Sequence, residues 1–259
     1  MPFADLPTVR LHYSFIGPAS APALILSNSL GSNLSMWDAQ APAFEKQFRL
    51  LRYDMRGHGQ SSAPPPPYAV LDLARDVLAL ADALNITHFH FCGLSIGGMI
   101  GMSLALQAPQ RLQKLILCNT APKIGTPEFW STRIQTVQTK GMKEVAGAVT
   151  ARWFTPNFQQ SSPAKIASAI RVLESLDPRG YVGGCTAVRD FDFHSDIAKI
   201  GAQTLVVSGT HDPAATPADG RFLVEHIPGA RYTELNTSHL SNIEDPEHFN
   251  EAVLSFLTA

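Results

Sequence analysis

One serine of this chain stands where it could act as a nucleophile. Ser95 lies at the centre of a Gly-x-Ser-x-Gly sequence, after the apolar, β-favouring run 88–92 and before the helical pattern 96–108. This arrangement predicts a sharp turn between a strand and a helix, which strains the serine backbone and exposes its hydroxyl. Side chains at Gly93 or Gly97 would collide with the neighbouring strand or helix, so the turn requires glycine at both positions.

A serine hydroxyl is a weak nucleophile at neutral pH and needs a positioned base. His239 is the candidate among nine histidines, because it follows the strand-like run 232–235 in a loop before the last helix. Asp212 follows the strand-like run 205–208, and its carboxylate would fix the tautomer of the histidine and stabilise the imidazolium. Along the chain the serine comes first, the acid second and the histidine third. Hydrolases in which the serine follows a strand have this order. Three other acids are weaker candidates because none follows a clear strand: Asp190, Asp192 and Asp196.

Acyl transfer also needs two N–H groups aimed at the oxygen on which negative charge develops. One N–H group is expected from Ile96, the residue after the serine and the first of the predicted helix. The other is expected from Leu30, in the loop after the run 23–27, where Gly31 allows a tight turn. Together with the serine, acid and histidine, these donors would form a complete site for ester hydrolysis.

Apolar runs and helical periodicity alternate along the first part of the chain. Several runs, such as Ala-Leu-Ile-Leu and Leu-Ile-Leu-Cys, are continuous, which is typical of central strands covered on both faces. The pattern predicts an α/β fold with a mostly parallel sheet flanked by helices, in which the first strand pairs antiparallel with the second. Asp54 and Arg56, in a turn-rich loop after the third run, are expected to brace that loop. The strand-like runs are 9–15, 23–27, 50–53, 89–92, 115–118, 205–208 and 232–235.

The alternation stops after residue 118. From about 121 to 190 the chain shows helix-like segments and no convincing strand. We expect one α/β core, residues 1–121 and 191–259, with a helical cap of residues 122–190 inserted into it; the alternative is a helical periphery of one larger core. A cap over the strand ends would cover the serine, exclude water and shape a pocket. The predicted cap helices are 129–140, 143–154, 163–176 and 181–189.

The composition is that of a globular protein, with 45% apolar and 16% charged residues and a formal net charge of −2. No basic run suggests a nucleic-acid surface, and no cluster has the spacing of a metal site. The first residues lack a signal-peptide pattern and no stretch approaches the ~20 apolar residues of a membrane span, so we expect a cytoplasmic protein without membrane contact. Cys92 and Cys118 lie in apolar runs and are expected to be buried thiols.

Several longer motifs extend these observations. The most specific of them are Phe-Cys-Gly-Leu-Ser, Leu-Cys-Asn-Thr-Ala and Arg-Trp-Phe-Thr-Pro. With these motifs the whole chain resembles the 3-oxoadipate enol-lactonase family of α/β-hydrolases. The resembling segments are 27–31, 53–59, 91–98, 117–121, 152–156 and 238–244. The resemblance implies an α/β-hydrolase fold and a triad of Ser95, His239 and Asp212. It also implies hydrolysis of 3-oxoadipate enol-lactone (5-oxo-4,5-dihydro-2-furylacetate) to 3-oxoadipate in aromatic catabolism, with no metal or organic cofactor.

The anionic lactone that the resemblance implies carries a free carboxylate, which needs a positive charge or a set of donors. We favour Arg133, on the predicted helix that also carries Trp130, because the guanidinium fork can bind a carboxylate through two hydrogen bonds. Trp153 would add an apolar wall. The other cap arginines remain candidates: Arg152, Arg171 and Arg179.

Other functions are compatible with the same serine turn. A general carboxylesterase and a carbon–carbon bond hydrolase would use the same triad, and only the cap would separate them. A non-catalytic ligand receptor on the same fold is a third reading, against which the intact Ser95, Asp212 and His239 argue. The sequence leaves open the oligomeric state, and whether His239 acts through an acyl-enzyme or by activating water directly.

Overall fold

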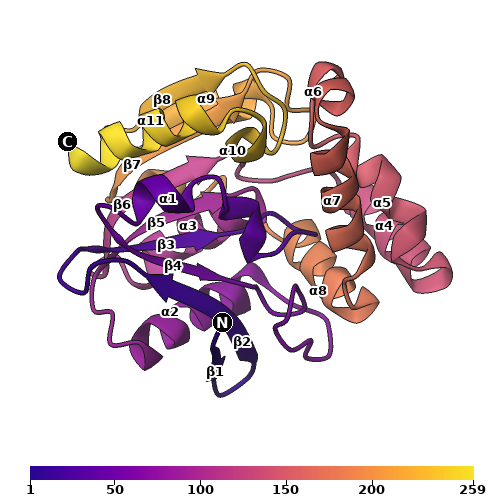
Figure 1. Cartoon of the computed structure of the whole chain (residues 1–259), viewed down its shortest axis with the longest axis horizontal. Helices are drawn as coiled ribbons and strands as arrows, with labels where there is room; N and C mark the ends of the chain where they lie inside the picture. Colours follow the sequence, from indigo (N-terminus) through magenta and orange to yellow (C-terminus); the bar gives the residue numbers. More distant parts are fainter.

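Eight strands form one sheet in the computed structural model, which describes all 259 residues (Figure 1). Their order across the sheet is β1-β2-β4-β3-β5-β6-β7-β8. The strands are β1 (Phe3–Asp5), β2 (Arg10–Ile16), β3 (Ala23–Ser27), β4 (Arg49–Tyr53), β5 (Phe89–Leu94), β6 (Leu112–Cys118), β7 (Gln203–Gly209) and β8 (Arg231–Leu235). All seven predicted strands are confirmed, and β1 is an additional one.

Helices connect most of these strands, together with the short 3-10 segments η1 (Leu34–Trp37) and η2 (Ile197–Lys199). Those outside the predicted cap are α1 (Ala41–Phe44), α2 (Val70–Ala83), α3 (Ile96–Gln107), α9 (Pro217–His226), α10 (Ser241–Glu244) and α11 (Pro246–Thr258). Helix α3 packs against β3, β5 and β6, while α11 contacts α1 and β8 and crosses the near side of the sheet in Figure 1. All six residues of β5 are buried, as expected of a strand covered on both faces.

The pairing of the first strands differs from the prediction. All neighbours from β4 to β8 along the sheet order are parallel, whereas β1–β2 and β2–β4 are antiparallel. The expectation that the first strand-like run pairs with the second is therefore wrong: β2 pairs with β4, and β3 lies on the far side of β4. The reason is burial. β3 is apolar and buried almost throughout and so suits the interior of the sheet, whereas β2 mixes buried and exposed residues.

The chain between β6 and β7 is helical and contributes no strand to the sheet. It forms α4 (Pro127–Lys140), α5 (Met142–Thr150), α6 (Pro156–Ser161), α7 (Pro163–Glu174) and α8 (Pro178–Arg189), which gather at the right of Figure 1. The predicted helix 143–154 ends early, at Thr150, and Thr155 caps the next helix, α6, which begins at Pro156. The exact division into a core and a cap stays a prediction.

The loop after β4 is braced as expected. Asp54 accepts hydrogen bonds from the Leu34 N–H at 2.7 Å and the Gln60 N–H at 2.9 Å. The Arg56 guanidinium donates two hydrogen bonds of 2.6 Å to the carboxylate of Asp76 on α2, and both side chains are buried. Because a charge removed from water needs a partner, this pair ties the loop firmly to the helix.

Loss of the buried partner should destabilise the fold strongly. We expect Asp76→Ala to lower the free energy of unfolding by about 3–5 kcal/mol, because it leaves a buried guanidinium unpaired. Asp82→Ala, on the same helix, removes an exposed carboxylate that pairs with Arg111, and should cost about 0–1 kcal/mol. Urea unfolding at pH 7 measures both variants. Similar losses in the two would contradict the assignment.

Candidate active site

Ser95 occupies the strained turn that its sequence predicts. It lies between β5 and α3 with φ +59° and ψ −116°, a region that non-glycine residues rarely adopt. A Cβ atom at Gly93 would lie 2.1 Å from the Gly97 carbonyl oxygen, and one at Gly97 would lie 2.3 Å from the Ser27 carbonyl oxygen. Glycine is therefore required at both positions, as predicted, because helix and strands approach too closely for a side chain.

Hydrogen bonds from the next strand hold the strained residue in place. The Ser95 N–H donates to the Cys118 carbonyl at 2.9 Å, and the Thr120 hydroxyl donates to the Ser95 carbonyl at 2.8 Å. Both main-chain polar groups of the serine are thus satisfied by the end of β6. The backbone cannot relax without breaking these bonds, which is how surrounding structure maintains a strained turn.

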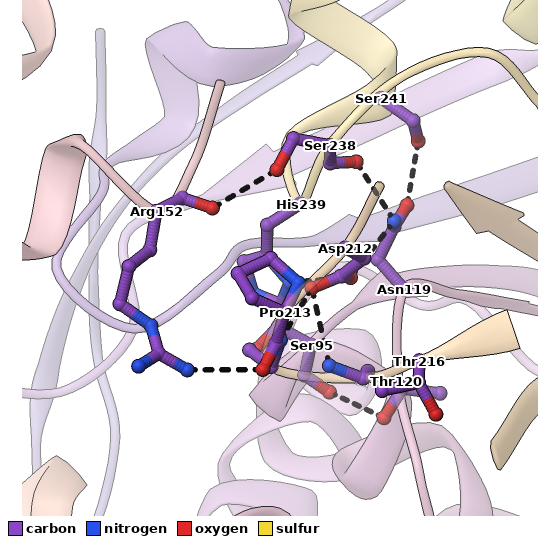
Figure 2. A network of polar contacts seen from close by, with 12 residues as sticks. Ser95, Asn119, Thr120, Arg152, Asp212, Pro213, Thr216, Ser238, His239 and Ser241 are labelled. Carbon is purple, nitrogen blue, oxygen red and sulfur yellow. Dashed lines mark hydrogen bonds and ion pairs between the residues drawn. The ribbon is translucent and has the colours of Figure 1, made fainter. Parts of the chain in front are cut away.

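His239 and Asp212 form a buried pair behind the serine. The His239 Nδ1–H donates to Asp212 Oδ2 at 2.8 Å, and both side chains are at most 5% exposed (Figure 2). This bond fixes the tautomer, so Nε2 is left as the nitrogen that can accept a proton. Ser95 and His239 both line one cavity of about 260 Å³, although no hydrogen bond joins them. Such contacts often tighten only when substrate binds.

Three further donors keep Asp212 ionised. The Ala214 and Ala215 N–H groups donate to its Oδ1 at 2.8 and 3.1 Å, and the Asn119 amide donates to Oδ2 at 3.1 Å. Burial raises the pKa of the Asp212 carboxyl, but the charge and hydrogen bond of His239 and the two N–H groups outweigh it, so the pKa lies below its ordinary value. The acid can therefore stabilise an imidazolium without taking its proton.

The loop after β3 carries Leu30, whose role as an oxyanion donor stays a prediction. Leu30 lines the cavity and its N–H has no protein acceptor. The adjacent Gly31, at φ +88°, donates its N–H to Nε2 of His58 at 3.1 Å, and Nδ1 of that histidine contacts the Arg56 carbonyl at 3.1 Å. Burial lowers the pKa of His58, which keeps the ring neutral and able to accept the bond. His58 thus holds the loop in shape.

The second predicted donor is the N–H of Ile96. Ile96 is the first residue of α3, so its N–H has no carbonyl one turn earlier to bind. Its side chain is buried and does not line the cavity. Only its main chain, next to Ser95, is available for chemistry, and its role as an oxyanion donor stays a prediction.

Side chains between β6 and β7 close the cavity from the other side. Trp130, Arg133 and Trp153 line it, as expected, and so does Arg152, whereas Arg171 and Arg179 do not. Arg133 has no carboxylate partner, and its guanidinium lies 4.6 Å from the ring centre of Phe129 and 5.1 Å from that of Trp130. The cavity is lined by two guanidinium groups and no acid, so it favours an anionic ligand.

Two residues of the site were missed by the sequence analysis. The hydroxyl of Tyr181 is buried without a hydrogen-bond partner at the cavity wall. Asn119 adopts φ +46° and donates to Asp212, while its amide oxygen accepts a 2.6 Å bond from the Ser241 hydroxyl. The Asp212 carboxylate and the Ser238 carbonyl can only accept, so they require the NH₂ group on their side and fix which way the amide faces. Asn119 lies directly after a strand, a position it shares with ordinary turn residues, and its Leu-Cys-Asn-Thr-Ala motif gave no role for the side chain.

No group of histidines, cysteines and acids in the chain could hold a metal ion. No helix has both the length and the apolar character needed to cross a membrane. All three cysteines are buried and free.

An acidic residue in place of Asn119 should disturb Asp212. Asn119→Asp keeps the size of the side chain but replaces the NH₂ group, which donates to Asp212 and to the Ser238 carbonyl, with an oxygen that only accepts when ionised. Two carboxyl groups then face each other without a donor between them, so we expect kcat/KM for p-nitrophenyl acetate at pH 7 to fall by about 10- to 100-fold. Ser241→Ala, which leaves the amide donor in place, should cost less. Wild-type activity in Asn119→Asp would refute the assignment.

Comparison with known proteins places this geometry in a family. A family model described as alpha/beta hydrolase fold matches residues 22–246. The chain is 42% identical to 3-oxoadipate enol-lactonase 2 of Acinetobacter baylyi, over 95% of this chain and 92% of the relative, and 36% identical to 3-oxoadipate enol-lactonase 1 of the same organism, over 93% and 90%. A crystal structure of the enol-lactonase from Burkholderia xenovorans LB400 superposes with a TM-score of 0.98 at 46% identity, with both chains fully covered. This chain belongs to the α/β-hydrolase family and, within it, to the 3-oxoadipate enol-lactonases.

Proposed function

We propose that this enzyme hydrolyses 3-oxoadipate enol-lactone to 3-oxoadipate with Ser95, His239 and Asp212 as its catalytic triad. The observation that carries the proposal is one cavity in which Ser95 and the His239–Asp212 pair meet an unpaired guanidinium, that of Arg133. The names of its enol-lactonase relatives support the substrate. The buried free thiols are consistent with a reducing cytoplasm, which we propose as its compartment.

Ring opening is the first half of the proposed reaction. His239 Nε2 takes the proton of the Ser95 hydroxyl as its oxygen attacks the lactone carbonyl, and the N–H groups of Leu30 and Ile96 hold the resulting oxyanion. Collapse of the tetrahedral intermediate breaks the ring C–O bond. The leaving group is an enolate, which is more stable than an alkoxide. It takes the proton of the His239 imidazolium, and the resulting enol tautomerises to the ketone.

Deacylation is the second half. His239 takes a proton from water, whose oxygen attacks the acyl-enzyme ester. It returns the proton to the Ser95 oxygen as the bond between that oxygen and the acyl group breaks. The released acid then ionises to a carboxylate. Asp212 stabilises the imidazolium in both halves. Direct attack by water activated by His239, without an acyl-enzyme, would use the same residues and remains the second route.

Arg133 is the proposed partner of the substrate carboxylate. Of the four arginines considered in this region, Arg179 is bound to Asp177 and Arg171 lies outside the cavity, whereas Arg152 uses one nitrogen to bind the Pro213 carbonyl at 3.0 Å. Arg133 lines the cavity, and its guanidinium has no carboxylate partner. Stacking on aromatic rings holds the guanidinium while leaving its N–H groups free. We propose Trp130 and Trp153 as apolar walls beside it.

Removal of the nucleophile tests the triad and the substrate together. Ser95→Ala should lower the decay rate of the enol-lactone, followed in the ultraviolet, by at least about a thousandfold, because no nucleophile remains for acylation. The product of the wild type should be 3-oxoadipate. A folded wild type that hydrolyses p-nitrophenyl acetate but leaves the lactone untouched would overturn the substrate and keep the triad.

Removal of the Arg133 charge tests the substrate carboxylate. Arg133→Leu should lower kcat/KM for the anionic lactone by about 10- to 100-fold, since a hydrogen bond to a charged group contributes about 1.5–3 kcal/mol. Turnover of neutral p-nitrophenyl acetate should change much less. Arg171→Leu, outside the cavity, is the matched control and should leave both substrates unaffected. Equal losses on the two substrates in Arg133→Leu would refute the assignment.

A further inference from the structure

Two segments of the chain, whose sequence motifs the catalytic triad does not explain, are joined by hydrogen bonds. One is the segment 152–155, between α5 and α6, and the other is the loop that carries the histidine. The Ser238 hydroxyl donates to the Arg152 carbonyl at 3.1 Å, and the Leu240 N–H donates to the Trp153 carbonyl at 3.0 Å. These bonds lie on either side of His239, so the segment 152–155 fixes the backbone both before and after the base.

Glu244 adds a charged link between the same two segments. Its carboxylate accepts a 2.9 Å bond from the Ser238 N–H and bonds of 3.3 Å from the Thr155 N–H. It also accepts a bond from the Thr155 hydroxyl. A carboxylate offers only acceptors, so it suits this set of donors, and charge-assisted bonds of this kind are stronger than neutral ones.

The segment 152–155 also reaches the loop of the acid. The Arg152 guanidinium donates to the Pro213 carbonyl at 3.0 Å, directly after Asp212 (Figure 2). Trp153 lines the cavity with its side chain while its carbonyl binds the histidine loop. One short segment therefore touches the ligand space and both loops that carry the His239–Asp212 pair.

We propose that Glu244 is a positioning residue that couples the segment 152–155 to His239, so that the seating of the helical cap sets the position of the base. The inference rests on the proposed role of His239. A substrate that packs against Trp153 contacts a segment whose carbonyl groups are hydrogen-bonded to residues 238 and 240. The cap thus contributes to turnover as well as to binding.

Glu244→Gln isolates this coupling with minimal change in shape. The amide keeps one acceptor oxygen but turns an NH₂ group toward N–H donors of Ser238 or Thr155, so one link must break. A catalytic group displaced by ~1 Å can cost about a hundredfold in rate. We expect kcat to fall roughly 10- to 100-fold with a smaller change in KM, and the labelling of Ser95 by a fluorophosphonate to slow in parallel. Glu247→Gln, an exposed acid on α11, is the matched control and should change neither rate.

Two further readouts separate positioning from general stability. The downfield proton resonance of the His239 Nδ1–H should shift or broaden in Glu244→Gln and stay unchanged in Glu247→Gln. Thr155→Val, which removes one hydroxyl, should lower kcat less, and the double variant Glu244→Gln/Thr155→Val should lose less than the two single losses combined, because both changes break the same link. A fall in melting temperature with kcat, labelling and resonance unchanged would overturn the proposal.

The labelling experiment distinguishes an incorrect substrate from an incorrect role of Glu244. The fluorophosphonate reports on Ser95 and His239 without any lactone. If the wild type labels rapidly but does not open the lactone, the substrate is wrong and the coupling is still decided by the labelling rates of Glu244→Gln and Glu247→Gln. Equal labelling of those two variants would refute the coupling whatever the substrate.

Discussion

The close approach of α3 to β3 and β5 is the constraint on which the site depends. There is no room for a side chain at Gly93 or Gly97, and Ser95 accepts a strained backbone as the result. The strain is held by bonds to the end of β6, so Ser95 is positioned by the sheet itself. Because the serine cannot move far, every other group of the site must be brought to it.

His239 and Asp212 are brought to the serine by loops, and loops are rigid only when their polar groups are bound. Ser238 illustrates how this is achieved, since its N–H, hydroxyl and carbonyl bind Glu244, Arg152 and Asn119 respectively. The partners come from α10, from the chain after α5 and from the end of β6. The position of His239 is therefore set jointly by the sheet and by the helical segment above it.

The sequence could predict those residues whose roles follow from local order. Ser95, Asp212 and His239 each follow a strand, and a parallel sheet brings such positions to one edge. The place of β4 between β2 and β3 could not be predicted, because strand order depends on pairings distant in sequence. Asn119 and Glu244 were missed for a related reason: an asparagine after a strand and an acid at the end of a short helix look like ordinary turn and surface residues until their partners are known.

The insertion between β6 and β7 also has a consequence for folding. β6 and β7 are neighbours in the sheet, with Lys114 opposite Gln203. They can pair only when the two ends of the helical segment between them come together. A loose loop of that length would make the pairing slow, since contacts distant in sequence form late. Here α4 packs on α8 and α5 on α7, which returns the chain toward its starting point. We expect early collapse of these helices to shorten the effective separation of the strands, so that the insertion that closes the cavity also helps the sheet to close.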